Sequence, residues 1–223
     1  ALLRAMGRIP VPVPVDRNGL DAERLASTLQ KEDAKLLVTV ATFHNPTGVT
    51  YSRARRERVL ALTRAHGVPL VEDDTYGDLR FSGSRIPSFR MLPGAEHVVH
   101  VGSFSKSLAA GLRLGYVIAQ EPLLRRMATV QEVHSIALPT LSQAVVARYI
   151  AEGGFHRHLS RLRRALRERR DAMLEAVHQH FPGEVEVTEP KGGMHLWVVL
   201  PEELSSLDLL KRAIGQGLGF APG

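Results

Sequence analysis

The sequence contains no cysteine, few lysines and no long apolar segment. Without cysteine the chain can form no disulfide, no thiolate metal site and no cysteine nucleophile. Proteins without disulfides are typical of the cytoplasm, so we expect a cytoplasmic protein. No apolar run approaches the length that a membrane-spanning helix needs, so we expect no membrane partner.

Arginine supplies most of the positive charge behind the net charge of +6. Many arginines lie within residues 156–170, where apolar residues recur at helical spacing. Arg164 and Glu168 stand four residues apart, as do Arg167 and Asp171, and such pairs are typical of a solvated helix surface. We therefore interpret this segment as an amphipathic helix rather than a nucleic-acid groove. The chain has only five lysines, and these are the candidate catalytic amines: Lys31, Lys35, Lys106, Lys191 and Lys211.

Apolar runs of strand length alternate with helical patterns along the first two thirds of the chain. The runs cover residues 35–40, 68–74, 97–103 and 114–119. This alternation predicts an α/β fold with a mostly parallel sheet. Ser52 can cap a helix that runs to His66, where Gly67 suits the left-handed C-terminal position. A later block of helix, two strands (residues 185–190 and 194–200) and helix predicts a smaller α+β domain. We expect residues 1–152 to form part of a large domain and residues 153–223 part of a small C-terminal domain, with the chain truncated at both ends.

Polar side chains follow three of the apolar runs. Asn45 comes after the first run, Asp73 ends the second, and Ser103 and Lys106 follow the third. Open α/β sheets bind ligands beyond the carboxyl ends of their strands. The sequence therefore predicts an amide, a carboxylate and an amine at one edge of the sheet.

These residue types suit the chemistry of a phosphorylated pyridine cofactor. An amine that forms a Schiff base must lose its proton, which requires a partly desolvated or positively biased setting. Lys106 has apolar neighbours and no adjacent carboxylate, so we expect it to have such a setting. Asp73 can keep a pyridine nitrogen protonated, which makes the ring an electron sink. Arg113 offers a two-pronged donor for phosphate, and Ser103 and Ser105 add hydroxyl groups.

Four motifs, HNPTG, VEDDTYGDL, GSFSKSLAAGLRLGYV and GGMHLW, occur in that order over nearly the whole chain. Together they resemble the pyridoxal-phosphate-dependent class I/II aminotransferases of fold type I. The resemblance implies the PLP-dependent transferase fold, pyridoxal 5'-phosphate as cofactor and a homodimer with the site at the subunit interface. It also implies transfer of an amino group between an amino acid and a 2-oxo acid.

The resemblance also implies roles for individual residues. Lys106 would form the aldimine with the cofactor and move the substrate proton, and Asp73 would pair with the ring nitrogen. Asn45 and Tyr76 would reach the phenolic oxygen, and the Asn45–Pro46 peptide is a candidate for the cis form. The residues expected to hold the phosphate are Ser103, Ser105 and Arg113.

The same motifs resemble the aminotransferase-like domains of MocR-type regulators of the GntR family. Those proteins join a winged-helix DNA-binding module to a domain that senses pyridoxal phosphate or an amino-acid adduct. Both interpretations stay open, and DNA would be a partner only through a winged helix preceding Ala1. Three elements expected from the resemblance lie outside the sequence: a phosphate-binding loop, an aromatic that stacks on the ring, and an arginine that binds the substrate carboxylate.

The histidines favour no metal site. His156 with His158, and His178 with His180, lie two residues apart in predicted helix and so face different directions. His44 and His195 adjoin the motifs and could line a substrate pocket, but a structural role is the favoured interpretation.

Overall fold

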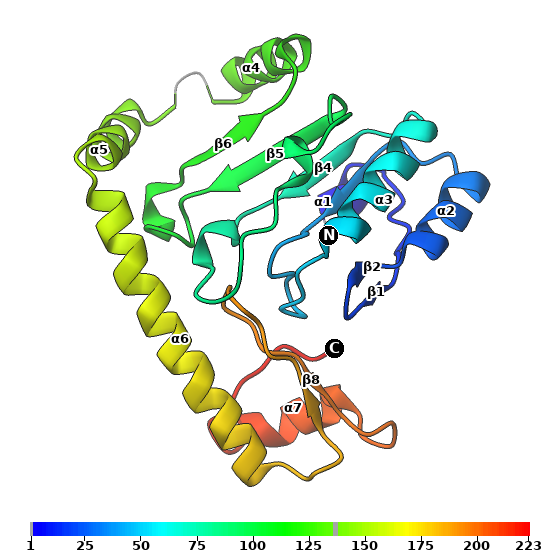
Figure 1. Cartoon of the computed structure of the whole chain (residues 1–223), viewed down its shortest axis with the longest axis vertical. Helices are drawn as coiled ribbons and strands as arrows, with labels where there is room; N and C mark the ends of the chain where they lie inside the picture. The colour runs from blue at the N-terminus through cyan, green and yellow to red at the C-terminus, as the bar shows by residue number, and fades with distance from the viewer. Residues whose placement is uncertain (1, 136–137) are drawn as a thin grey trace.

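A four-stranded sheet forms the centre of the computed structural model, which describes residues 2–135 and 138–223 (Figure 1). The strands, in spatial order, are β3 (Leu37–Thr39), β4 (Leu70–Asp73), β5 (Val98–Ser103) and β6 (Gly115–Ile118). The first three are parallel, as predicted, and β6 runs antiparallel to β5. The connection before β6 holds only one short 3-10 helix, η3 (Ala110–Leu112), and is too short for the crossover that a parallel strand requires.

Two helices, α2 (Ala22–Lys31) and α3 (Arg53–Ala65), pack on each other and on the sheet. Ser52 caps α3, as predicted, because its side chain accepts a hydrogen bond from the Arg55 amide at 3.2 Å. Gly67 follows the helix with a φ of 65°, a left-handed conformation that glycine adopts without strain. Both ends of α3 are therefore specified locally by the sequence.

The main core lies between these helices and the sheet. Leu25 of α2, Val59 of α3, Leu70 of β4 and Val98 of β5 belong to one cluster, and each is at most 1% exposed. Burying each such side chain contributes about 2 kcal/mol from the removal of apolar surface from water. Before this core come α1 (Leu2–Ala5) and a hairpin of β1 (Val15–Asp16) and β2 (Gly19–Leu20). The proline-rich residues 8–14 join no sheet.

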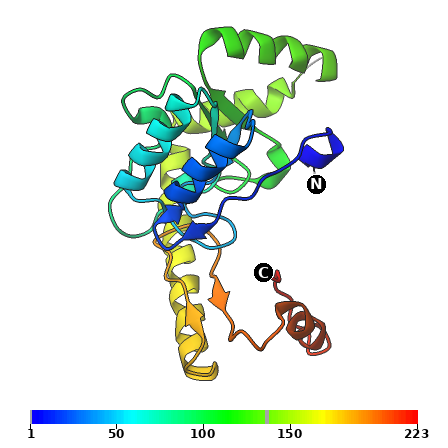
Figure 2. The ribbon, with the colours of Figure 1, turned by 90° about the vertical axis from the view of Figure 1, so that its right-hand side faces the viewer.

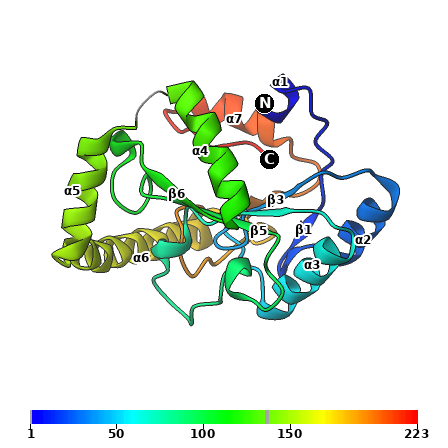
Figure 3. The same cartoon turned by 90° about the horizontal axis from the view of Figure 1, so that it is seen from above.

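Three helices follow the sheet: α4 (Glu121–Ser135), α5 (Thr140–Ala151) and α6 (Gly154–His180). Seen from above, α5 and α6 lie on the opposite side of the molecule from α2 and α3 (Figure 3). The long helix α6 runs from the sheet to the C-terminal elements at the far end of the molecule (Figures 1 and 2). Its Leu166 packs in a second buried cluster with Phe43, Tyr76 and Leu79, which follow the carboxyl ends of β3 and β4.

The C-terminal elements are an antiparallel pair, β7 (Glu186–Val187) and β8 (Val198–Val199), and α7 (Ser206–Ile214). The expectation of a long strand over residues 194–200 was wrong, because only Val198 and Val199 pair with β7. Further back in the segment, Lys191 and Gly193 form backbone hydrogen bonds with the loop after β4, which carries the 3-10 helix η1 (Gly77–Leu79). A further 3-10 helix, η2 (Phe89–Met91), precedes β5.

None of the described helices is long and apolar enough to cross a membrane.

Candidate active site

The three consecutive acids at the end of β4 occupy different environments. Side chains alternate between the two faces of a strand, so Asp73 points away from the side shared by Glu72 and Asp74. Oδ1 of Asp73 accepts hydrogen bonds from the amide of Thr75 at 3.0 Å and from its hydroxyl at 2.5 Å. Its Oδ2 receives no hydrogen bond from the described residues. Asp73 is half-buried, and one oxygen stays available to a donor.

Asn45 and Tyr76 meet beyond the carboxyl ends of β3 and β4. The Asn45 amide nitrogen donates to the Tyr76 hydroxyl at 3.3 Å, although the two residues lie 31 positions apart. The Asn45–Pro46 peptide is cis, as the sequence suggested. Tyr76 is buried at 7% exposure, whereas Asn45 is exposed. An amide and a hydroxyl thus form one polar pair three residues after Asp73.

Lys106 lies in the turn that follows β5. At the start of this turn the Ser103 hydroxyl accepts a hydrogen bond from the Ser105 amide at 3.1 Å, which fixes the local backbone. The expectation that Lys106 is partly desolvated was wrong for this chain, because its side chain is exposed. The turn leaves the sheet directly after Ser103, so the apolar neighbours of Lys106 in sequence do not enclose its amine.

The antiparallel pairing of β5 and β6 brings Arg113 back to the same turn. Ser103 pairs with Gly115, and the Phe104 amide donates to the Leu114 carbonyl at 3.1 Å. Arg113 has a φ of 53° and is exposed, so its guanidinium is free to meet an anion. Two hydroxyls and one arginine therefore surround the turn that carries Lys106.

His195 reaches this region from the C-terminal part of the chain. Its ring lies edge-on to Tyr76, with the centroids 5.3 Å apart and the planes at 82°. Burial lowers the pKa of His195, and the positive charge of Lys106 lowers it further. Burial and His195 likewise lower the pKa of His44, whose Nδ1 lies 2.9 Å from the Thr47 hydroxyl. We had favoured a structural role for His195, and no local pattern in the sequence shows that it contacts Tyr76.

A buried charge network underlies the strand end that carries Asp73. Arg56 of α3 and Glu72 are both fully buried, and their side chains form an ion pair at 3.3 Å. Glu72 also accepts from the Phe89 amide at 3.0 Å and lies 3.1 Å from Nδ1 of His100. The hydrogen bond with Glu72 raises the pKa of His100, and burial opposes the rise. The network joins α3, β4, β5 and η2 into one rigid unit.

Asp74 stands beside this network without a hydrogen-bond partner for its buried Oδ1. Burial raises its pKa to about 6, and the neighbouring charge of Glu72 acts in the same direction. Neither Asp74 nor Arg56 was recognised as important from the sequence. For Arg56 a signal exists: with Val59, Leu60 and Thr63 it falls on the buried face of α3 at helical spacing.

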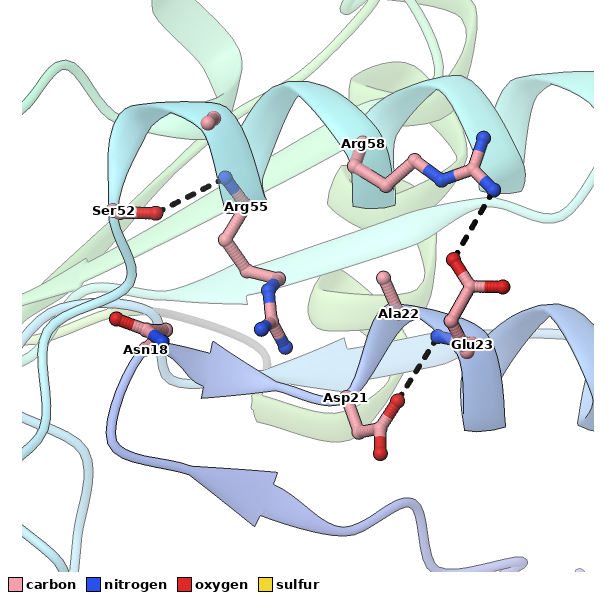
Figure 4. Close-up of a pocket in the computed structure, with 8 residues that line it drawn as sticks. Asn18, Asp21, Ala22, Glu23, Ser52, Arg55 and Arg58 are labelled. Atoms are coloured by element: carbon pink, nitrogen blue, oxygen red, sulfur yellow. Dashed lines mark hydrogen bonds and ion pairs between the residues drawn. The ribbon is translucent and has the colours of Figure 1, made fainter.

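A surface hollow of about 390 Å³ lies between the start of α2 and the start of α3 (Figure 4). Its charged side chains already have partners. Arg55 pairs with Asp16 at 3.0 Å, and Arg58 with Glu23 at 3.3 Å. Asp21 accepts from two amides at the start of α2. None of the predicted site residues lines the hollow, so the candidate site lies elsewhere, at the carboxyl ends of β3 to β5.

Known proteins with similar sequences and structures belong to a family whose fold agrees with this sheet. The family model described as aminotransferase class I and II matches residues 1–217. The chain belongs to the class I and II aminotransferase family. Its relatives in this family include the 2-aminoadipate transaminase of Thermus thermophilus, which is 36% identical over 223 residues. That match covers 99% of this chain and 56% of the transaminase.

Solved aminotransferase structures share the fold. The α-aminoadipate aminotransferase of Thermus thermophilus, complexed with N-(5'-phosphopyridoxyl)-L-leucine, superposes with a TM-score of 0.92 at 35% identity, covering 99% of this chain and 57% of that one. The HTH-type transcriptional regulator YisV of Bacillus subtilis is 33% identical over 215 residues, which are 93% of this chain and 44% of the regulator. This aminotransferase-family chain spans about half the length of such curated relatives.

Proposed function

We propose that this chain is the pyridoxal-phosphate-binding part of an aminotransferase. The observation that carries the proposal is the gathering of Asp73, the Asn45–Tyr76 pair and Lys106 beyond the carboxyl ends of adjacent strands. Open α/β sheets bind ligands at this edge. The phosphopyridoxyl compound bound to the Thermus aminotransferase supports the same cofactor here.

The residues present fit the cofactor in chemical type. When bound, pyridoxal phosphate supplies an aldehyde that combines with amines and a ring that takes up electrons from the substrate Cα. The uncommitted oxygen of Asp73 is an acceptor for the protonated ring nitrogen. The amide of Asn45 and the hydroxyl of Tyr76 are donors for the phenolic oxygen. Among the described residues no cluster of three or more potential metal ligands occurs.

Lys106 and the groups around it would carry out the remaining tasks. Its Nζ would hold the cofactor aldehyde and would also be the base that takes the proton from the substrate Cα. Because Lys106 is exposed, its amine has room to swing between these two positions. Ser103, Ser105 and Arg113 surround the same turn and would hold the phosphate by hydroxyl and guanidinium hydrogen bonds.

The expected partners of the whole protein follow from this chemistry. We propose an amino acid and a 2-oxo acid as substrates, a homodimeric assembly and a cytoplasmic location. The domain division that we propose places residues 1–152 in the large cofactor-binding domain and residues 153–223 in the small one. The similarity to YisV supports a second candidate, an amino-acid-sensing domain of a MocR-type regulator. A winged helix encoded upstream of Ala1 would favour that candidate.

Amino transfer is tested by incubating the chain with pyridoxal phosphate and a panel of amino acids. Mass spectrometry then measures pyridoxamine phosphate and the matching 2-oxo acid. We expect both products in equal amounts from the wild type and neither from Lys106→Ala above the level of free cofactor. Lys191→Ala is the matched control, because Lys191 is also exposed but lies outside the predicted site. Equal product from both variants would contradict the proposal.

A further inference from the structure

The segment of residues 190–195 is held tightly against the loop after β4. The amides of Phe81 and Ser82 both donate to the Lys191 carbonyl at 3.1 Å, and the Gly193 amide donates to the Leu79 carbonyl at 3.1 Å. A Cβ at Gly192 would overlap the Phe43 ring and come within 2.7 Å of the Leu79 carbonyl oxygen. Only glycine permits this approach, so the backbone position of the segment is closely defined.

This docking places the His195 ring in the candidate site. The ring contacts Tyr76, whose hydroxyl accepts a hydrogen bond from Asn45. It also lies close enough to Lys106 for the positive charge of that residue to lower the pKa of His195. The position of Gly48 adds a constraint from the other side, because a Cβ there would lie 3.0 Å from the His195 carbonyl oxygen. His195 therefore connects the docked segment to the Asn45–Tyr76 pair.

The surroundings of the two ring nitrogens assign the tautomer of His195. Nδ1 is buried and has no hydrogen-bond partner among the described residues. A buried N–H without an acceptor costs more than a buried lone pair, so the proton resides on Nε2. Nε2 also has no hydrogen-bond partner among the described residues. Unlike Nδ1 it is not fully buried, so it remains accessible as a donor. Burial and the charge of Lys106 both favour the neutral ring.

We propose that His195 is a specificity-determining residue, whose Nε2–H donates a hydrogen bond to an oxygen on the side chain of the amino-acid substrate. The proposal rests on the aminotransferase function proposed above. A neutral donor discriminates between side chains with and without an acceptor, because an analogue that lacks the oxygen leaves the donor unpaired. It suits this task better than anchoring the α-carboxylate, which every amino acid carries and for which a charged guanidinium or ammonium is the stronger partner.

A substrate pair of equal length tests the selectivity. We compare kcat/KM for 2-aminoadipate, which has a terminal carboxylate, with that for norleucine, which ends in a methyl group. In His195→Phe, which keeps a ring against Tyr76, we expect a loss of about tenfold for 2-aminoadipate, the value of one hydrogen bond, and a change below about twofold for norleucine. His195→Gln retains an N–H donor and should recover most of the selectivity. Equal losses for both substrates, or no loss for either, would overturn the proposal.

A second measurement needs no turnover and separates this inference from the proposed function. Nitrogen-15 NMR of the histidine side chains of the full chain reports which ring nitrogen carries the proton. At pH 7.5 we expect His195 as the neutral Nε2–H tautomer, with an Nε2 shift on adding 2-aminoadipate but not norleucine. If no amino acid is transaminated but this selective shift occurs, the proposed aminotransferase function fails, whereas the selective hydrogen bond from His195 stands as part of an amino-acid-binding site. A protonated Nδ1, or identical responses to both amino acids, would refute it.

Discussion

Replacing Glu72 by glutamine should destabilise the fold strongly, because it leaves a buried charge unpaired. Arg56 and Glu72 are both 0% exposed, and the other partners of Arg56 are neutral oxygens of Tyr51, Ala41, Thr42 and Pro87. Breaking a buried ion pair costs about 3–5 kcal/mol. Since four neutral acceptors remain to share the arginine charge, we expect the lower end, about 3 kcal/mol.

Urea unfolding followed by circular dichroism measures this loss. At a typical slope of about 3 kcal/mol per molar urea, the midpoint should fall by about 1 M with the slope unchanged. The matched control is Glu57→Gln, which breaks the pair with Arg53 on the surface of α3, where the side chains are 50% and 66% exposed. That change should cost less than about 0.5 kcal/mol. Equal shifts for the two variants would refute the assignment of Glu72 as a stabilising buried partner.

The remaining predictions concern the pH dependence, a helix cap and a close backbone approach. The pKa of Asp74 is about 6 in the folded chain, above its value of 3.8 when unfolded, so its contribution to stability is present below pH 3.8 and lost as the pH rises through 6. Asp74→Asn should therefore stabilise the fold at pH 7.5 by on the order of 2 kcal/mol. It should also make the unfolding free energy less dependent on pH between pH 4 and 6, and an unchanged pH dependence would contradict this. Ser52→Ala removes the cap of α3 and should lower the unfolding free energy by about 1 kcal/mol, whereas no loss would show that the cap is not stabilising. Gly192→Ala should cost about 1–3 kcal/mol through overlap with Phe43 and increase hydrogen exchange at the Gly193 amide, and wild-type exchange would argue against the docked segment.

Local sequence patterns were enough to predict the elements whose ends are determined by neighbouring residues. Ser52 and Gly67 bound α3 because a side-chain cap and a left-handed glycine act within one helical turn. The carboxyl ends of the parallel strands were predicted from the points at which the apolar runs end. The contact of Asn45 with Tyr76, in contrast, was expected only from the family resemblance, since it joins two loops far apart in sequence.

The sequence did not reveal features that depend on long-range packing. Arg56 resembles the surface arginines around it, and only the apolar spacing of α3 hints that it is buried. The short β8 and the position of His195 both follow from the docking of residues 190–195 on the loop after β4. No periodicity encodes that docking, because it depends on the space that Gly192 leaves for Phe43.

The central claim, that Lys106 binds pyridoxal phosphate, is tested most directly by chemical trapping. The chain is mixed with the cofactor and reduced with borohydride, and the modified lysine is mapped by mass spectrometry. We expect labelling at Lys106, with none on the matching peptide of Lys106→Ala. The other four lysines serve as internal controls for non-specific reaction. Labelling spread evenly over the lysines, or confined to one other than Lys106, would show that Lys106 does not bind the cofactor.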